Sequence, residues 1–138
     1  MTHDYSENIL IQESASDLLR DELGWETVYA YNTEQLGETG TLGRKSYKEI
    51  LLTRYFREAL LRLNPWLTPA QVDEAQRLME HRLSTASLLQ INEEKYSLIR
   101  DGIPVTVKKP SGRTEKKYAA VIDFQNPDNN HFLAVQEL

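Results

Sequence analysis

The sequence contains no cysteine, which excludes disulfide frameworks, thiol nucleophiles and cysteine-based zinc sites. It also lacks any run approaching the roughly 18 consecutive apolar residues of a membrane-spanning helix. Its beginning, MTHDYSENIL, is polar and acidic and does not have the basic and then apolar pattern of a secretory signal. We therefore expect a cytoplasmic protein without a membrane partner.

Linkers rich in glycine and serine, low-complexity tracts and internal repeats are absent as well. The 138 residues, 40% of them hydrophobic and 27% charged, suit one ordinary domain with its own core. We expect a single unit over residues 1–138, with a helical part over residues 1–101 and a β meander over residues 102–138.

The net charge of −5 is unevenly distributed. The first 40 residues contain nine acidic residues and one basic residue, whereas residues 41–138 contain 15 basic and 12 acidic residues. Such a balance permits nucleic acid as a partner without requiring it. Two clusters supply the basic excess, the first being Arg44, Lys45, Lys48, Arg54, Arg57 and Arg62 and the second Lys108, Lys109, Arg113, Lys116 and Lys117.

Helix signals dominate the first two thirds of the chain. Residues 14–23 predict a short helix, residues 25–31 a strand, and residues 32–43, with three glycines, a loop. Ser46 and Glu49 have the spacing of a capping box, so we expect a helix over residues 47–63. Its apolar arc is wide, which indicates packing on more than one side.

The next helix has a stronger start signal. Thr68 and Gln71 have capping-box spacing, Pro69 occupies the first helical position, and Leu67 and Val72 are placed for a hydrophobic staple. We expect this helix to reach about residue 83, and a further helix over residues 87–100.

The pattern changes after Gly102 to short β-rich runs. Predicted strands cover residues 103–107, 118–124 and 131–135, with turn-like segments at residues 110–113 and 125–130. The expected class is therefore α+β, with N-terminal helices packed on a small, mainly antiparallel sheet.

No catalytic constellation stands out. His3, His81 and His131 are too scattered for a metal site by any spacing rule, so no metal ligand or catalytic residue is predicted. Residues 40–46 (GTLGRKS) faintly resemble a phosphate-binding loop, but their spacing is wrong and no strand leads directly into them. A loop that feeds a capped helix is the favoured interpretation.

Two segments remain open to more than one interpretation. Asp123, Asn126, Asp128 and Asn129 could bind a hard cation through oxygen, but they also have the composition of a tight turn, which we favour. The basic residues Lys108, Lys109, Arg113, Lys116 and Lys117 surround a predicted hairpin turn. They could neutralise DNA phosphates, or they could protect exposed strand edges from unwanted pairing.

Three stretches resemble the amino-terminal region of the restriction (R, or HsdR) subunit of type I restriction-modification enzymes. They are residues 42–52 (LGRKSYKEILL) with 57–65 (REALLRLNP), residues 101–105 (DGIPV), and residues 122–135 (IDFQNPDNNHFLAV). The likeness extends in order from about Gly24 to the last residue, and the third motif is specific.

The resemblance implies a large subunit that cleaves DNA and translocates it with ATP, in complex with specificity and methylation subunits. It also implies a nuclease domain of the PD-(D/E)xK kind, in which Asp, Glu and Lys side chains hold Mg²⁺ and position water. These positions lie beyond Leu138 in the family, as do the ATP-binding motifs. No catalytic residue can therefore be assigned here, and the chain alone is expected to be inactive and to hold no cofactor.

The leading hypothesis is an incomplete nuclease domain, either an excised piece or a truncated gene product, that serves as a scaffold. The alternative is a self-contained module that binds DNA or protein without catalysis, and an unrelated small enzyme is a third possibility. If the domain is incomplete, the apolar run at residues 132–135 should belong to a larger sheet. We then expect self-association through this strand, or its protection by the predicted helix at residues 47–63.

Overall fold

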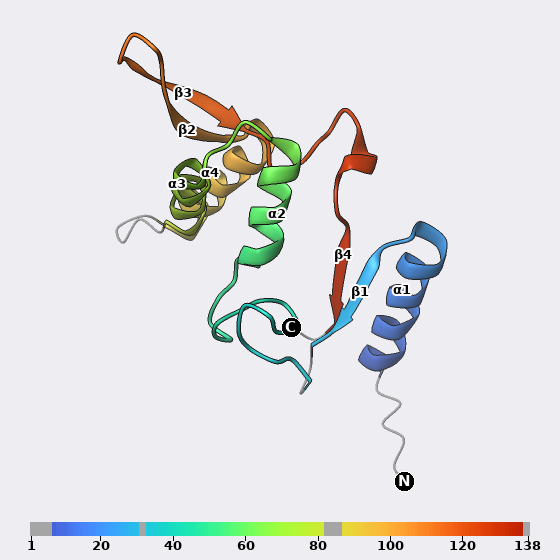
Figure 1. Cartoon of the computed structure of the whole chain (residues 1–138). Helices are drawn as coiled ribbons and strands as arrows, with labels where there is room; N and C mark the ends of the chain where they lie inside the picture. Colours follow the sequence, from blue (N-terminus) through green and yellow to red (C-terminus); the bar gives the residue numbers. More distant parts are fainter. Residues whose placement is uncertain (1–6, 31–32, 82–86, 137–138) are drawn as a thin grey trace. The chain divides into compact units, whose positions relative to one another are not determined.

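The computed structural model describes residues 7–30, 33–81 and 87–136 of the chain. Contacts within the chain gather in two compact units. Unit 1 combines Met1–Tyr47 with His131–Leu138, and unit 2 is Lys48–Asn130. The elements, labelled in Figure 1, are α1 (Glu7–Leu23), β1 (Glu26–Tyr29), α2 (Thr53–Leu63), α3 (Pro69–Glu80), α4 (Leu88–Asp101), β2 (Ile103–Lys108), β3 (Thr114–Ala119), the 3₁₀ turn η1 (Pro127–Asn129) and β4 (Leu133–Gln136). The class is α+β, as predicted.

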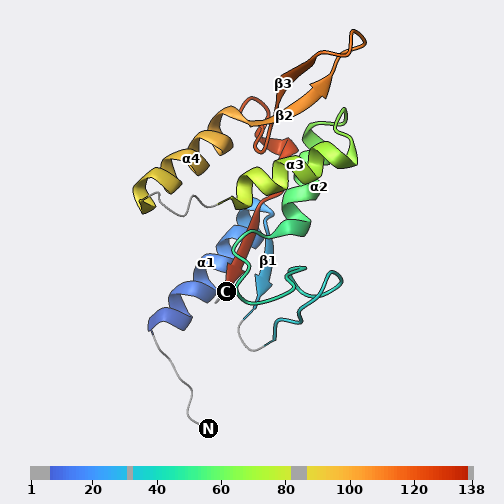
Figure 2. The same cartoon turned by 90° about the vertical axis from the view of Figure 1, so that its left-hand side faces the viewer.

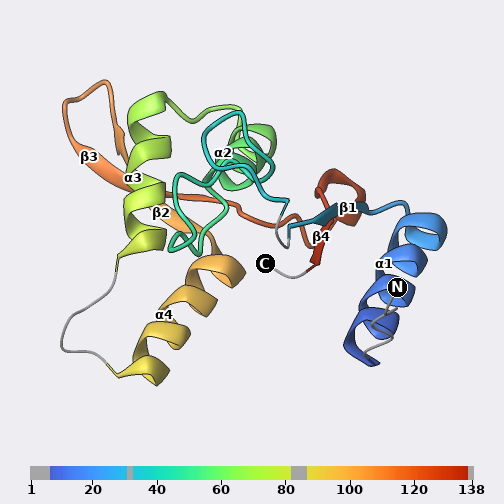
Figure 3. The same ribbon diagram turned by 90° about the horizontal axis from the view of Figure 1, so that it is seen from below.

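Unit 1 is built on a parallel pair of strands that lie far apart in the sequence. Glu26 of β1 pairs with Leu133 of β4, and the register continues to Tyr29 opposite Gln136. Helix α1 runs alongside both strands (Figures 1 and 3). At the start of the pair, the rings of Trp25 and Phe132 stack with centroids 5.1 Å apart.

The predicted β meander over residues 102–138 is therefore wrong. Only β2 and β3 form an antiparallel pair, while β4 leaves them and joins β1 in a separate two-stranded sheet. The short alternating runs after Gly102 predicted strands, but a local pattern does not reveal a parallel partner about 100 residues away in the sequence.

Helix α2 begins at Thr53, six residues later than predicted. Its N-cap is Leu52, which provides no side-chain cap, so the capping box expected from Ser46 and Glu49 does not start this helix. The boundary between the two compact units falls at Tyr47 and Lys48. Residues 46–52 therefore connect the units in a non-helical conformation, and this tertiary demand overrides their local helix signal.

The starts of the next two helices agree with the sequence patterns. The Thr68 hydroxyl accepts the Gln71 amide, the Gln71 side chain accepts the Thr68 amide, and Pro69 is the first helical residue. Ser87 and Gln90 form the same reciprocal capping box on α4. The end predicted for α3 at residue 83 falls outside the described residues.

The hairpin of β2 and β3 pairs Ile103 with Ala119 through Lys108 with Thr114. The strand predicted over residues 118–124 is therefore shifted, because β3 ends at Ala119. The turn sets this register, with the Lys109 amide donating to the Arg113 carbonyl and the Gly112 amide to the Lys109 carbonyl. Gly112, at φ +84°, supplies the left-handed backbone that such a turn requires.

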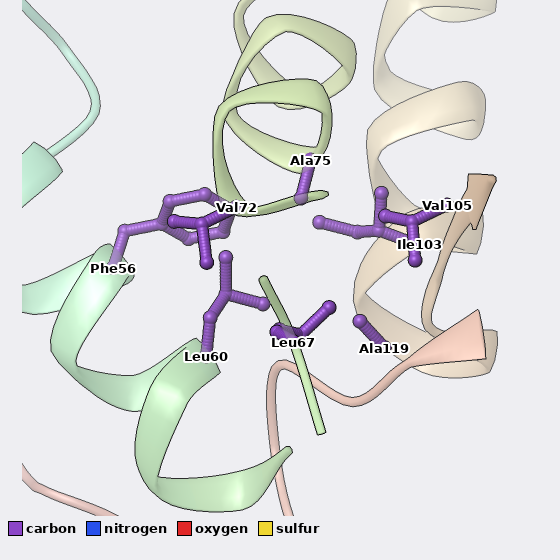
Figure 4. Packing of buried hydrophobic residues seen from close by; sticks show 8 residues of the cluster. All are labelled: Phe56, Leu60, Leu67, Val72, Ala75, Ile103, Val105 and Ala119. Atoms are coloured by element: carbon purple, nitrogen blue, oxygen red, sulfur yellow. The ribbon is translucent and has the colours of Figure 1, made fainter. Parts of the chain in front are cut away.

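The core of unit 2 lies where α2 and α3 meet the base of the hairpin (Figure 4). Leu60, Ala75, Ile103, Val105 and Ala119 are fully excluded from solvent. The whole cluster is Phe56, Leu60, Leu67, Val72, Ala75, Ile103, Val105 and Ala119. Burial of these apolar side chains fixes the base of the hairpin against the helices, while its tip extends past them (Figure 2).

Candidate nucleic-acid interface

The predicted DNA-binding residues lie on the β2–β3 hairpin and its exposed tip. Lys108 ends β2, Lys109 and Arg113 flank the turn, and Lys116 and Lys117 lie on β3. All five residues are exposed. The base of the hairpin is fixed to the core, and its tip extends away from the helices of unit 2 (Figures 1 and 2).

Three of these five cations are engaged within the protein. The ammonium of Lys109 lies 2.9 Å from the Glu115 carboxylate. That of Lys116 donates to the Thr106 hydroxyl at 2.8 Å and lies 3.3 Å from Glu74. Lys117 places its ammonium 4.2 Å from the centre of the Trp66 ring. Their charge is partly balanced before any ligand arrives.

The side chains of Lys108 and Arg113 have no ion-pair or hydrogen-bonding partner among the described residues. They lie on either side of the turn, at the end of the hairpin most distant from the core. Since a phosphate gains most from a cation that is not already paired, the hairpin is strongest as a phosphate-binding element at its tip.

Helix α3 holds the middle of the hairpin in place. The Glu74 carboxylate accepts the amide of Thr106 at 3.0 Å and its hydroxyl at 2.9 Å. Partial burial raises the pKa of Glu74, but hydrogen bonds from Thr106 and Lys116 outweigh it and hold the pKa below its ordinary value. Glu74 therefore stays ionised and keeps Lys116 beside it.

The segment from Asp123 to Asn130 is a polar turn, as the sequence favoured. The Asp123 carboxylate accepts the amides of Gln125 at 3.1 Å and Asn126 at 2.9 Å, and the side chain of Asn129 at 3.0 Å. Its donors thus come from the protein itself, which is how aspartate stabilises turns. The described residues contain no group of acidic or histidine side chains arranged to hold a metal ion.

The turn should be sensitive to acid. Hydrogen bonds from the Asn126 amide, the Asn129 side chain and the Gln125 amide hold the pKa of Asp123 below its ordinary value of 3.8. This stabilisation is complete above pH 3.8 and is lost as the pH falls through the lower folded pKa. We predict that acidification lowers the protection factor of the Asn126 amide against hydrogen exchange in the wild type, and that Asp123→Ala abolishes this acid-dependent loss of protection. Asp128→Ala is the control.

Asp128 suits this control because it lies in the same turn, while the amides of Gln125 and Asn126 and the side chain of Asn129 donate to Asp123. Equal exchange in the wild type and in Asp123→Ala at neutral pH would contradict the role of Asp123 in ordering the turn.

The phosphate-loop likeness of residues 40–46 has no structural counterpart. No helix follows this loop directly, because α2 begins at Thr53. Arg44 points into unit 1, where its guanidinium pairs with Glu34, and both side chains are almost fully buried. An arginine held in this way orders the loop, so residues 40–46 lack the helix terminus that a phosphate would need.

The two described histidines, His131 and His81, belong to different compact units. His131 Nε2 lies 2.5 Å from the Glu26 carboxylate in unit 1. The carbonyl of His81 accepts the Lys95 ammonium at the end of α3 in unit 2. His3 lies outside the described residues. The described part of the chain thus combines a small α+β architecture with a basic hairpin and without a catalytic cluster.

The model of the family "Type I restriction enzyme R protein N terminus" matches residues 4–138, so the chain belongs to that family. It is 29% identical over 116 residues to the type I restriction enzyme HindI endonuclease subunit of Haemophilus influenzae, covering 84% of this chain and 11% of that protein. It is 23% identical over 132 residues to a putative type I restriction enzyme MjaIXP endonuclease subunit of Methanocaldococcus jannaschii, covering 96% of this chain and 12% of that protein.

The chain thus spans roughly a tenth of the length of these curated relatives. No solved structure matches it. Within the described residues, no helix combines the length and apolar character needed to cross a membrane. The family resemblance expected from the sequence motifs is confirmed.

Proposed function

We propose that these residues form the N-terminal portion of the DNA-cleaving, ATP-dependent R subunit of a type I restriction-modification system, which defends a cell against foreign DNA. The family match over residues 4–138 carries this proposal. The full-length subunit acts in the cytoplasm with specificity and methylation subunits on DNA. Mg²⁺ and ATP bind to parts of the subunit outside these residues.

The contribution of this segment is a scaffold for an endonuclease domain of the PD-(D/E)xK kind. In unit 1, the parallel pair of β1 and β4 packs beside α1. Parallel strands normally lie inside larger sheets, so further strands of the subunit would extend this pair. Self-association through β4 stays a prediction for the 138-residue chain when it is studied alone.

The purified 138-residue chain is expected not to cleave DNA. The described residues hold no acidic cluster for Mg²⁺, and nuclease chemistry of this kind needs one. The measurement is the conversion of supercoiled plasmid to its nicked or linear form in the presence of Mg²⁺. Nicking that is abolished by a substitution within residues 1–138 would contradict the scaffold role.

Salt-dependent DNA binding tests the hairpin. We expect weak binding without sequence preference, in which Lys108 and Arg113 each contribute about 0.9 to the slope of log K against log salt. The variant Lys108→Ala/Arg113→Ala should therefore flatten that slope by nearly 2, while Lys109→Ala/Lys116→Ala should change it less because those cations are paired within the protein. If both double variants and the wild type had equal slopes, the DNA-binding site would lie outside the hairpin.

A second candidate function is a self-contained module that binds DNA or protein. The enclosed core of unit 2 favours it, because residues 48–130 supply the whole cluster from α2, α3, β2, β3 and the connection between the two helices. Gene sequence beyond codon 138 separates the two candidates. An uninterrupted frame with an Asp and a Glu-x-Lys motif supports the R subunit, whereas a stop codon supports the module.

A further inference from the structure

The hairpin of β2 and β3 forms a two-stranded sheet, and the free edge of β2 is occupied by side chains of α3. The outward amide of Thr106 donates to Glu74 at 3.0 Å, and its carbonyl accepts the Gln71 side chain at 3.1 Å. These contacts satisfy the backbone where another strand would otherwise pair. The β2 edge is closed at its centre.

The edge formed by β3 is closed only at one end. The Asn64 side chain donates to the Ala120 carbonyl and accepts the Ala120 amide, both at 2.8 Å, as a neighbouring strand would. Counting back by twos, the backbone groups of Tyr118, Lys116 and Thr114 also point outward. None of them has a hydrogen-bonding partner among the described residues.

Lysines commonly guard such an edge, but here they are held away from it. Lys116 reaches across the sheet to Thr106 and Glu74 at the β2 side, and Lys117 lies over Trp66. Edge protection by these lysines was one of the two interpretations that the sequence left open. Their contacts instead leave three consecutive outward positions of β3 accessible to an extended chain.

We propose that this edge pairs with the β3 edge of a second copy of the chain, in antiparallel orientation about a twofold axis at Lys116. In this register Lys116 faces Lys116 of the second copy, and Thr114 faces Tyr118. All three open positions then lie in hydrogen-bonded pairs, so two hairpins merge into one four-stranded sheet.

Charge selects this register over its neighbours. Glu115 faces Lys117 of the second copy twice, once on each side of the axis, and opposite charges in cross-strand positions attract. A shift of the axis to residue 115 would place two glutamates opposite each other, and a shift to residue 117 two lysines. The Lys116 pair on the axis is tolerated because each ammonium is already held by Glu74. The edge is therefore self-complementary, as a twofold interface requires.

Charge exchange tests the proposal on the complete 138-residue chain. Sedimentation equilibrium should show a weak dimer at concentrations up to about 1 mM. In Glu115→Lys both pairs of residues 115 and 117 consist of two lysines, and in Lys117→Glu both consist of two glutamates, so each variant should dimerise on the order of tenfold more weakly. A mixture of the two variants restores both attractive pairs and should form a heterodimer.

Glu93→Lys is the matched control, because Glu93 is an exposed glutamate on α4, away from the hairpin, and it makes the same change of charge. It should dimerise like the wild type. Circular dichroism of each variant checks folding. The proposal would be overturned if the wild type were monomeric or if the mixture of the two variants failed to associate. It would also be overturned if neither hairpin substitution weakened the dimer, because the contact would then lie at another edge such as β4.

Disulfide trapping gives a second readout in a chain without cysteine. Lys116→Cys places the two thiols on the axis, where Cα atoms about 5.5 Å apart allow a disulfide. Ser111→Cys is the control, because the antiparallel arrangement puts the two hairpin tips at opposite ends of the sheet. We expect a covalent dimer from Lys116→Cys only. Equal trapping of both variants would contradict the register.

Discussion

Replacing Arg44 by methionine is expected to destabilise unit 1 by about 3–5 kcal/mol. Arg44 donates from Nε to Glu34 at 2.9 Å and makes a second contact with the same carboxylate, and the side chains are 6% and 3% exposed. Methionine fills much of the same volume but leaves the Glu34 carboxylate buried without its cation. That uncompensated charge, rather than a lost attraction alone, dominates the expected cost.

The acid dependence of this effect distinguishes a buried charge from a packing defect. In the wild type, the hydrogen bond from Arg44 outweighs burial and holds the pKa of Glu34 below its ordinary value of 4.5. Wild-type stability from this pair is therefore lost as the pH falls below 4.5. In Arg44→Met only the effect of burial on Glu34 remains, so the pKa of Glu34 rises above its ordinary value. The variant therefore loses stability as the pH increases and the buried Glu34 carboxyl ionises.

The difference in unfolding free energy between the wild type and Arg44→Met should therefore become smaller on acidification. The double variant Glu34→Leu/Arg44→Met removes both charges and should recover most of the loss. The measurement is urea unfolding at several pH values. The fluorescence of Trp25, which lies in unit 1 against Phe132, monitors the unfolding. If this difference in unfolding free energy did not change with pH, the destabilisation would come from a packing defect and not from a buried charge.

The second large effect is expected in unit 2. Leu60 is fully buried where α2 meets α3 and the hairpin (Figure 4), so Leu60→Ala should cost about 2–5 kcal/mol through lost burial and a residual cavity. Leu61, the next residue on the same helix, is 50% exposed, and Leu61→Ala should change stability by about 0.5 kcal/mol or less. Trp66, in unit 2, reports this unfolding.

The pair of leucine variants separates burial from helix propensity, because both make the same substitution in the same helix. Similar losses for Leu60→Ala and Leu61→Ala would contradict the core described for unit 2. A loss seen only by Trp25 would show that the change acts in the other unit.

Local signals predicted the elements whose stabilising contacts are themselves local. The capping box of Thr68 and Gln71 needs only residues three positions apart, and the structure contains it. The box expected at Ser46 does not start a helix, since its segment connects two compact units. The strand expected after residue 118 was shifted because the turn at Lys109 and Gly112 sets the register of β3.

In the candidate site, too, local sequence predicted some features, whereas others depend on tertiary packing. Sequence position grouped the five basic residues around one turn, and the structure places them on one hairpin. Which of them are already paired could not be predicted, because the partners Glu74 and Trp66 lie about 40–50 residues earlier in the chain and reach the hairpin only through tertiary packing. The closure of the β2 edge by α3 was missed for the same reason.

The pairing of β1 with β4 also orders events during synthesis. Among the described residues, every member of the core of unit 2 lies within residues 48–130, so we expect this segment to fold before β4 has been made. Glu26 and Tyr29 must wait until Leu133 and Gln136 have been made, more than 100 residues later. Closing so long a loop is slow when the chain between is unstructured, and a folded segment 48–130 shortens it. Strand β1 therefore stays without its partner while all the residues between it and β4 are being synthesised.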